Sequence, residues 1–195
     1  MMDVAFDALN AVSDETLLVL YGNGDGAAAR ALTLRLGPMA YRLAVRMLND
    51  RAEAEDLVQE AMLRLWKIAP EWRAGEAKIS TWLYRVVTNL ATDRLRRRRG
   101  VGLDEAPELP DGAASALEQM IDEDRAQALE MALAQLPARQ RQAVILRHLE
   151  GLSNPEIAAA MEIGVEAVES LTARGKRALA QLLAGRREEL GYGHD

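Results

Sequence analysis

The stretch from Leu152 to Leu171 constrains the fold most, because it has the pattern of a helix, a tight turn and a second helix. Ser153 followed by Glu156 predicts a capping box at a helix start, and Pro155 is tolerated in a first helical turn. The apolar positions and the turn are Ile157, Ala158, Met161, Ile163, Gly164, Val165, Val168 and Leu171. This pattern predicts a helix-turn-helix, whose second helix reads the major groove of DNA.

The outward face of the second predicted helix carries the candidate DNA contacts. They are Glu166, Ser170, Thr172, Arg174, Lys176 and Arg177. Carboxylates such as those of Glu166 and Glu169 can accept from cytosine amino groups, but they weaken the general attraction to phosphates. We therefore expect this helix to need help in holding DNA. The alternative interpretation is an ordinary pair of antiparallel helices joined by a glycine turn.

The composition favours an all-α protein. Hydrophobic residues make up 49% of the 195 residues and aromatic residues only 4%, and the chain has few β-branched runs bounded by turns. It has no cysteine, which excludes disulfides and thiolate metal sites. Neither a bilayer-spanning apolar run nor a signal sequence is evident, so we expect no membrane insertion and a cytoplasmic location.

The charge pattern divides the chain. The net charge is −6, which disfavours nonspecific coating of nucleic acid, yet five arginines are gathered between residues 94 and 99. Residues 101–124 contain acidic but no basic residues, and glycines and prolines are frequent up to residue 112. We therefore predict two helical domains, residues 12–100 and 118–187, joined by a flexible acidic linker at residues 101–117.

The first domain is predicted to contain helices at residues 14–21, from about 27 to 48 with a bend at Gly37-Pro38, at 51–68 after an Asp50 cap, and at 79–98. The helix at 51–68 has a second face that combines acids with exposed aliphatic residues. That face contains Asp56, Gln59, Glu60, Met62 and Leu63, and its composition suits docking on a basic partner. A metal site at Glu53, Asp56 and Glu60 is disfavoured because no histidine or cysteine lies nearby.

The helix at 79–98 has a polar face opposite its apolar stripe, with Thr88 and Thr92 among its members. The candidates there for binding single-stranded nucleic acid are Trp82, Arg85, Asn89, Asp93, Arg94, Arg96 and Arg97. Aromatic rings stack on bases and arginines bind phosphates. The alternative is that Trp66, Trp82 and Tyr84 belong to the core, which we prefer for the tryptophans, and that the arginines form a solvated helix end.

Enzyme chemistry finds no support in the sequence. His148 and His194 have no serine or paired acids arranged around them, and no glycine-rich phosphate loop follows a strand. We expect no catalytic residues, no metal and no cofactor.

Four blocks of the chain, taken together, are similar to a known family. They are residues 37–44, residues 52–61, residues 80–97, and Leu136-Pro137-Ala138-Arg139-Gln140-Arg141 before the helix-turn-helix. In order and spacing they resemble the extracytoplasmic-function (ECF) group of bacterial RNA polymerase sigma factors. The resemblance implies that residues 12–100 are region 2, which binds core polymerase and the minus-ten element, and that residues 118–187 are region 4, which binds the minus-thirty-five element.

The resemblance also implies roles for single residues. Asp56, Gln59 and Glu60 would contact the polymerase clamp, which accounts for the docking face that Leu63 shares. Asn89 would help to capture a flipped base, and the arginines after it would handle the melted strand. The linker resembles a segment that threads towards the polymerase active centre, and an anti-sigma factor would hold the free protein. The second helix of the helix-turn-helix departs from many relatives at Glu169 and Leu171, so it is expected to use DNA shape and phosphates more than base edges.

We thus expect an alternative sigma factor that directs promoter recognition, DNA opening and transcription initiation, and supplies no catalysis. Its partners would be core RNA polymerase, promoter DNA and an anti-sigma factor. Two weak DNA contacts held in register by polymerase reinforce each other through effective concentration. The alternatives are a stand-alone dimeric helix-turn-helix regulator, which would bind its operator without polymerase, and a helical enzyme.

Overall fold

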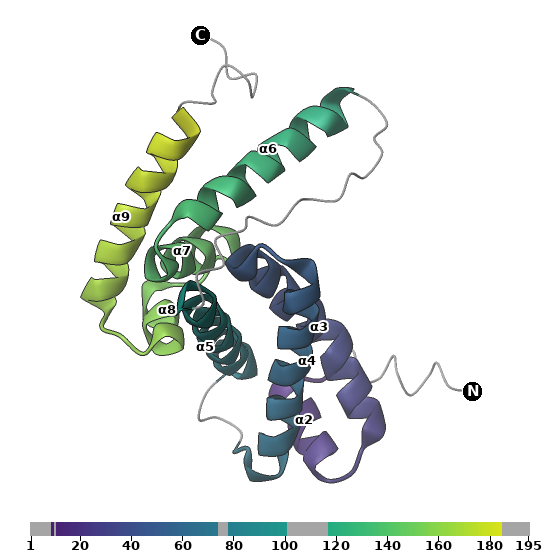
Figure 1. Cartoon of the computed structure of the whole chain (residues 1–195). Helices are drawn as coiled ribbons and strands as arrows, with labels where there is room; N and C mark the ends of the chain where they lie inside the picture. The colour runs from purple at the N-terminus through teal and green to yellow at the C-terminus, as the bar shows by residue number, and fades with distance from the viewer. Residues whose placement is uncertain (1–8, 10, 74–77, 101–116, 185–195) are drawn as a thin grey trace.

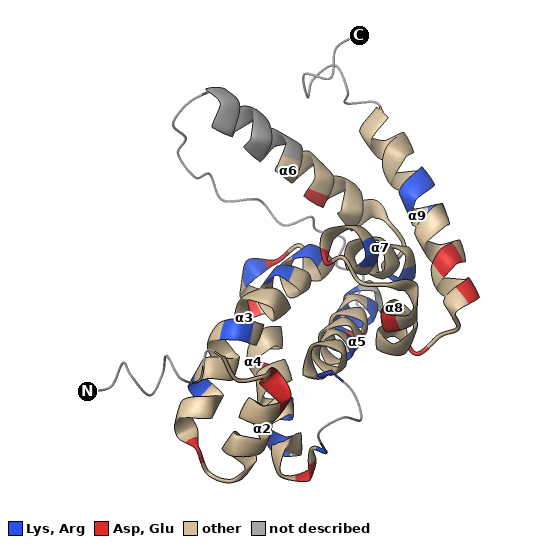
Figure 2. Ribbon diagram, turned by 180° about the vertical axis from the view of Figure 1, so that it is seen from behind, with Lys and Arg blue, Asp and Glu red and all other residues tan. Residues whose placement is uncertain are grey.

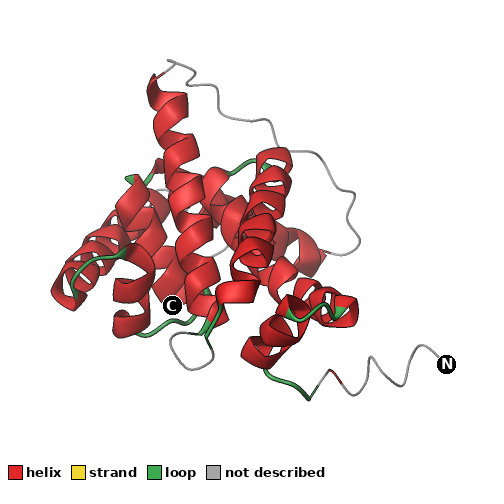
Figure 3. Cartoon of the chain, turned by 90° about the horizontal axis from the view of Figure 1, so that it is seen from below, coloured by secondary structure: helices red, strands yellow, loops and turns green. Residues whose placement is uncertain are grey.

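The computed structural model describes residue 9 and residues 11–73, 78–100 and 117–184 (Figure 1). The elements of the first lobe are α2 (Asp14–Gly22), α3 (Gly26–Leu48), α4 (Arg51–Ile68), the short 3-10 turn η1 (Ala69–Glu71) and α5 (Ile79–Gly100). Those of the second lobe are α6 (Leu117–Gln135), α7 (Ala138–Val144), the π-helical turn η2 (Ile145–Leu149), α8 (Asn154–Met161) and α9 (Val165–Ala184). Figure 3 shows no strand in these ranges, so the all-α prediction is confirmed for them. Residues 101–116 of the predicted linker, residues 185–187 and His194 lie outside the described residues.

Local side-chain chemistry fixes where the helices begin. Asp25 accepts hydrogen bonds from Ala27 N and Ala28 N at the start of α3, and Asp50 accepts from Glu53 N, 3.0 Å away, at the start of α4. Such caps satisfy backbone N–H groups that have no partner inside the helix. Helix α3 continues through Pro38, where the sequence suggested a bend, and ends at Leu48.

Helix α3 is the centre of the first lobe, because it packs against α2, α4 and α5. The core of this lobe contains many fully buried leucines. They are Leu17, Leu18, Leu32, Leu43, Leu57, Leu65 and Leu83. Two residues expected on polar faces are buried instead. Met62 is 7% exposed. Thr88 is 0% exposed, and its hydroxyl can be buried because it donates a hydrogen bond to the backbone oxygen of Tyr84.

The second lobe is built on α7, which packs against α9, while α8 packs against α9 as a helix-turn-helix requires. Gly175 allows the close approach of α9 to α7, since a Cβ atom there would lie 2.6 Å from Val144 Cγ2. Val168 is fully buried between these helices. Val165, expected to face inward, is 40% exposed, because it is the first residue of α9 and lies beyond the core contact that Val168 makes.

The two lobes are in direct contact. Helix α5 packs against α8, and α3 packs against α6 and α7 (Figure 1). Buried residues of both lobes belong to one continuous hydrophobic cluster. The helix-turn-helix therefore lies against the helix whose polar face carries the candidate single-strand contacts.

Candidate nucleic-acid and protein interfaces

The outer face of α4 presents most of its predicted docking residues to solvent. Asp56 and Gln59 are exposed, and Leu63 is 59% exposed, although a leucine in that position gains nothing from water. Spacings of three and four residues place them with Glu60 on one side of the helix. Glu60 is engaged within the lobe, since its carboxylate lies 2.6 Å from Arg64 Nη2 and 3.4 Å from Arg94 Nη2.

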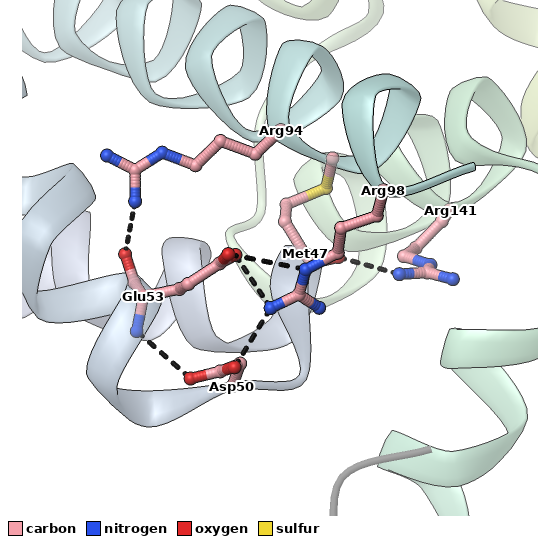
Figure 4. A network of polar contacts seen from close by, with 6 residues as sticks. All are labelled: Met47, Asp50, Glu53, Arg94, Arg98 and Arg141. Carbon is pink, nitrogen blue, oxygen red and sulfur yellow. Dashed lines mark hydrogen bonds and ion pairs between the residues drawn. The ribbon is translucent and has the colours of Figure 1, made fainter. Parts of the chain in front are cut away.

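A cluster of ion pairs joins the start of α4 to the end of α5 (Figure 4). Arg98 Nη2 lies 2.9 Å from Asp50 Oδ2 and 2.8 Å from Glu53 Oε2. Arg94 Nη1 donates to the backbone oxygen of Glu53 at 2.7 Å. Arg94, predicted to handle the melted strand, therefore packs α5 against α4, whereas Arg97 is exposed at the helix end.

An open hollow of about 480 Å³ lies between the end of α4, the first half of α5 and the residue that follows α8. Its lining residues are Arg64, Lys67, Ile68, Trp82, Arg85, Val86, Asn89 and Glu162. Three predicted candidates, Trp82, Arg85 and Asn89, are thus brought together. Sequence reasoning missed Arg64 and Lys67, although their spacing of three residues near the end of α4 places two cations on one side of that helix.

The hollow combines an aromatic ring, an amide and cations, which suits an unstacked base and its phosphate. Asn89 is exposed, and Trp82 and Arg85 are partly exposed. Further along the outer side of α5, Asp93 and Arg96 form an ion pair with each other. Arg96 and Arg97 remain accessible to solvent.

Two other aromatic residues are structural. Trp66 packs on Tyr21 with ring centroids 4.7 Å apart and an interplanar angle of 58°. Tyr84 is 8% exposed, and its hydroxyl donates to Glu150 Oε2 at 3.3 Å. Burial and then the neighbouring Glu150 carboxylate raise the pKa of Tyr84 to about 12. The core interpretation is confirmed for these two rings, and Trp82, like Trp66, is partly buried against the core.

The helix-turn-helix begins with the predicted capping box. Ser153 N donates to Glu156 Oε2 at 3.0 Å, and Glu156 N donates to Ser153 Oγ at 3.4 Å. The hydrogen bond from the Ser153 backbone, followed by those from its hydroxyl and from Lys78, lowers the pKa of Glu156 to about 2. Helix α8 ends at Met161, and the next residue, Glu162, has a φ of 53°, in the left-handed region.

The outward face of α9 carries mixed charge (Figure 2). Glu166, Arg174, Lys176 and Arg177 are exposed, and Ser170 is partly exposed. Arg174 donates to Ser170 Oγ, with Nε at 3.2 Å and Nη2 at 2.5 Å, and these bonds hold its guanidinium along the helix.

The remaining α9 candidate, Thr172, is half-buried, and its hydroxyl oxygen is covered. Within the described ranges, no cluster of three or more metal-ligating side chains could hold a metal ion. No helix there is long and apolar enough to cross a membrane.

Comparison with known proteins decides the family. The model of Sigma-70 region 2 matches residues 32–101, and that of Sigma-70, region 4 matches residues 126–179. The ECF RNA polymerase sigma factor SigM of Mycobacterium tuberculosis strain H37Rv is 32% identical over 183 residues, which cover 92% of this chain and 89% of that protein. The chain belongs to the ECF sigma factors.

Other relatives of this sigma factor agree. The ECF sigma factor SigE of Mycolicibacterium smegmatis is 36% identical over 148 residues, and the match covers 74% of this chain but only 57% of that relative's length. Among solved structures, the sigma factor RpoE of Bartonella quintana, in complex with the anti-sigma factor NepR, superposes with a TM-score of 0.64 at 25% identity. That match covers 78% of this sigma factor and 94% of the RpoE chain. The alternative of a stand-alone regulator is not favoured.

Proposed function

We propose that this sigma factor binds core RNA polymerase through the outer face of α4, opens the minus-ten element at the hollow beside α5, and binds the minus-thirty-five element with α9. The observation that carries the proposal is the gathering of Trp82, Arg85 and Asn89 with Arg64 and Lys67 around one open hollow. Such a set can stack a base and neutralise the phosphates next to it.

Polymerase docking is assigned to Asp56, Gln59, Glu60 and Leu63. An exposed leucine beside carboxylates suits a partner surface that combines an apolar pocket with basic residues, because the apolar contact then supplies affinity and the charges supply orientation. Glu60 contributes through a carboxylate that Arg64 and Arg94 already hold in place.

Promoter contacts are divided between the lobes. The first lobe, residues 12–100, uses the hollow together with Arg96, Arg97 and the Asp93 and Arg94 side chains that shape the end of α5. The second lobe, residues 118–187, presents Glu166, Ser170, Thr172, Arg174, Lys176 and Arg177. The linker at residues 101–117 would connect the two in the polymerase complex.

The acidic balance of the chain fits this arrangement. A net charge of −6 makes the free protein a weak ligand of DNA, whereas two contacts held by polymerase reinforce each other. We infer that the protein works in the cytoplasm beside polymerase, supplies no catalysis, and is held inactive by an anti-sigma factor. The complex of the similar RpoE chain with the anti-sigma factor NepR supports the last of these inferences.

The test is run-off transcription with core polymerase, combined with permanganate footprinting of unpaired thymines. Asn89→Ala should retain polymerase binding in a pull-down but lower promoter opening by about tenfold or more, a loss of roughly 1.4 kcal/mol of stabilisation of the open strand. Arg174→Ala should weaken closed-complex formation instead, because it removes a phosphate contact. The exposed Glu71→Gln variant serves as the control and should match the wild type.

Two results would contradict the proposal. One is tight binding of a promoter duplex by the chain alone, which would favour the stand-alone dimeric regulator. The other is an unchanged pattern of transcript starts when the chain is added to core polymerase. Circular dichroism of Asn89→Ala and Arg174→Ala separates a lost contact from a lost fold.

A further inference from the structure

The carboxylate of Glu169 is exposed in the first half of α9, the part of a second helix that contacts base edges in a helix-turn-helix. Figure 2 shows acidic residues in the first turns of α9 and a basic residue further along. The positions three and four residues from Glu169 hold Val165, Glu166, Thr172 and Ala173. Helix α9 therefore offers Glu169 no cation at helical spacing. The next cation along the chain, Arg174, donates to Ser170 instead.

A hydrogen bond from the first helix of the helix-turn-helix orients this carboxylate. Asn154 Nδ2 donates to Glu169 Oε1 at 3.3 Å. Asn154 is the first residue of α8 and follows Ser153, whose capping box with Glu156 fixes the start of that helix. Helix α8 in turn packs against α9. The donor is thus held by a capped helix start rather than by a loop, and its bond restricts the directions in which Glu169 can point.

The second oxygen of Glu169 remains available to a donor on DNA. A carboxylate has two oxygens that accept hydrogen bonds, and Asn154 contacts only Oε1. In the major groove cytosine presents an amino donor, whereas guanine and thymine present acceptors that repel a carboxylate. Adenine also has an amino group, but its N7 acceptor lies next to that group. Cytosine is therefore the base that a fixed carboxylate favours.

We propose that Glu169 reads a cytosine of the minus-thirty-five element through the amino group of that base, and that Asn154 is the positioning residue that orients the carboxylate. This inference rests on the proposed function of α9 and adds a base contact to the readout of shape and phosphates expected from the sequence. The negative charge lowers the affinity for DNA in general, and the cytosine contact offsets that loss only at the correct sequence. Glu169 thus contributes specificity rather than affinity.

Selection from a promoter library tests the cytosine contact. The full chain is assembled with core polymerase and mixed with duplexes of a promoter that this holoenzyme transcribes, in which every base of the minus-thirty-five element is randomised. Bound duplexes are separated on a gel and sequenced. The wild-type holoenzyme should enrich cytosine at one position of one strand by roughly tenfold over the other bases.

The Glu169→Gln variant should change the preferred base instead of abolishing binding. A glutamine amide both donates and accepts, which matches the N6 and N7 groups of adenine. The preference at that one position should therefore move from cytosine to adenine, while the other positions keep their pattern. Glu71→Gln removes the same charge at an exposed site outside both DNA interfaces and should reproduce the wild-type pattern.

Removal of the carboxylate should also separate affinity from specificity. Glu169→Ala should bind a duplex without a minus-thirty-five element more tightly than the wild type does, because a negative charge facing the phosphates is lost. The same variant should lose the enrichment of cytosine. A damaged fold would lower both the affinity and the enrichment, so the opposite directions of these two changes identify a lost base contact.

Two substitutions test the positioning role of Asn154. Asn154→Ala should lower the enrichment of cytosine severalfold at the position that responds to Glu169→Gln and at no other, because the carboxylate remains but is no longer oriented. Asn154→Gln keeps an amide donor and should restore part of the enrichment. A merely structural role in joining α8 to α9 would instead weaken binding to all library members alike. Circular dichroism checks that both variants are folded.

The outcomes distinguish this inference from the proposed function. An enriched motif that lacks cytosine, or one that is the same for the wild type and Glu169→Gln, would overturn the base contact and leave the sigma-factor function standing. An Asn154→Ala pattern identical to that of the wild type would overturn the positioning role. Failure of the wild-type chain to redirect core polymerase in run-off transcription would overturn the proposed function itself, and this inference with it.

Discussion

At the scale of single residues, Gly175 shows how closely the second lobe is packed. A Cβ atom there would lie 2.6 Å from Val144 Cγ2 and 3.1 Å from the backbone oxygen of Gln140. The Val144 side chain can shift by rotation, but the oxygen belongs to the α7 backbone and cannot move without moving that helix. Glycine at this position therefore serves the contact between α7 and α9.

We predict that Gly175→Ala lowers the free energy of unfolding by about 1–3 kcal/mol, because overpacking outweighs the better helix propensity of alanine. Urea unfolding followed by circular dichroism measures the change. Gly26→Ala is the control, since nothing lies within 4 Å of the position of its Cβ atom. A Gly175→Ala variant as stable as Gly26→Ala would show that the two helices can separate at no cost.

Residues differ in how far the sequence reveals their roles. Ser153, Glu156 and Asp50 act on neighbours within three positions, so their capping was predictable from local spacing. Arg141 was not, because its Nη1 donates to the backbone oxygen of Met47, 94 positions away in sequence. A backbone acceptor leaves no trace in the sequence. Arg94 was misleading for a related reason, since its guanidinium contacts the Glu53 backbone.

At the scale of elements, the start of α4 carries two roles on one side chain. Asp50 caps the helix through Glu53 N and also pairs with Arg98 at the end of α5. We predict that Asp50→Ala loses both and costs about 1–2 kcal/mol, mostly from the cap. Asp50→Asn keeps the cap and loses only the ion pair, so it should stay within about 0.5 kcal/mol of the wild type. Equal losses in thermal unfolding of the two variants would show that the ion pair dominates.

The capping box of α8 gives a pH dependence of known sign. The pKa of Glu156 is lowered from 4.5 to about 2, so its carboxylate stabilises the folded state above pH 4.5, and that contribution is lost as the pH falls towards 2. The Glu156→Gln variant should show a flatter loss of stability over this range in acid titrations followed by circular dichroism. Solvent screening keeps the effect small, because the side chain is 36% exposed. An identical acid profile in the variant would place the sensitivity elsewhere.

Periodicity predicted most elements, since a buried stripe at helical spacing is needed wherever one face packs on a core. Helices α4 and α5 begin where the sequence placed them, and α8 follows its capping box. The segment after Val144 differs. Its apolar pattern fits a single helix, but α7 ends at Val144 and continues as the π-helical turn Ile145–Leu149. Periodicity cannot separate the two, because Ile145 and Leu146 are buried in either geometry.

At the scale of the whole molecule, the contact between lobes is the feature that the sequence did not predict. A glycine- and proline-rich acidic segment suggested two lobes joined flexibly, whereas α5 and α8 pack together. Only part of the lining of the hollow could be predicted, because its residues come from three separate segments of the chain. Trp82, Arg85 and Asn89 share one helix face, but Arg64 and Lys67 come from another helix and Glu162 from the other lobe.

Arg141 links the lobes at their centre. It is 4% exposed and donates to Met47 O at 2.6 Å (Figure 4). It also donates to the backbone oxygens of Ala134 and Leu136. We predict that Arg141→Met destabilises the chain by roughly 2–4 kcal/mol, because several buried carbonyls lose their donor. The variant should also broaden the distribution of distances between dyes attached at Glu55→Cys in α4 and Ala173→Cys in α9, which reports the separation of the two lobes. Arg139→Met, exposed on the same helix, should do neither. A stable, closed Arg141→Met chain would contradict this role.

The hydrogen-bond acceptor of Arg141 is a main-chain oxygen, and this has a consequence for protein engineering. No substitution of the Met47 side chain can remove that acceptor. A mutation can therefore abolish this hydrogen bond only by replacing Arg141. A chimera that joins this second lobe to the first lobe of another sigma factor should therefore keep this hydrogen bond, provided that the helix equivalent to α3 ends at the same turn. Promoter specificities could then be recombined without redesigning the contact between the two lobes.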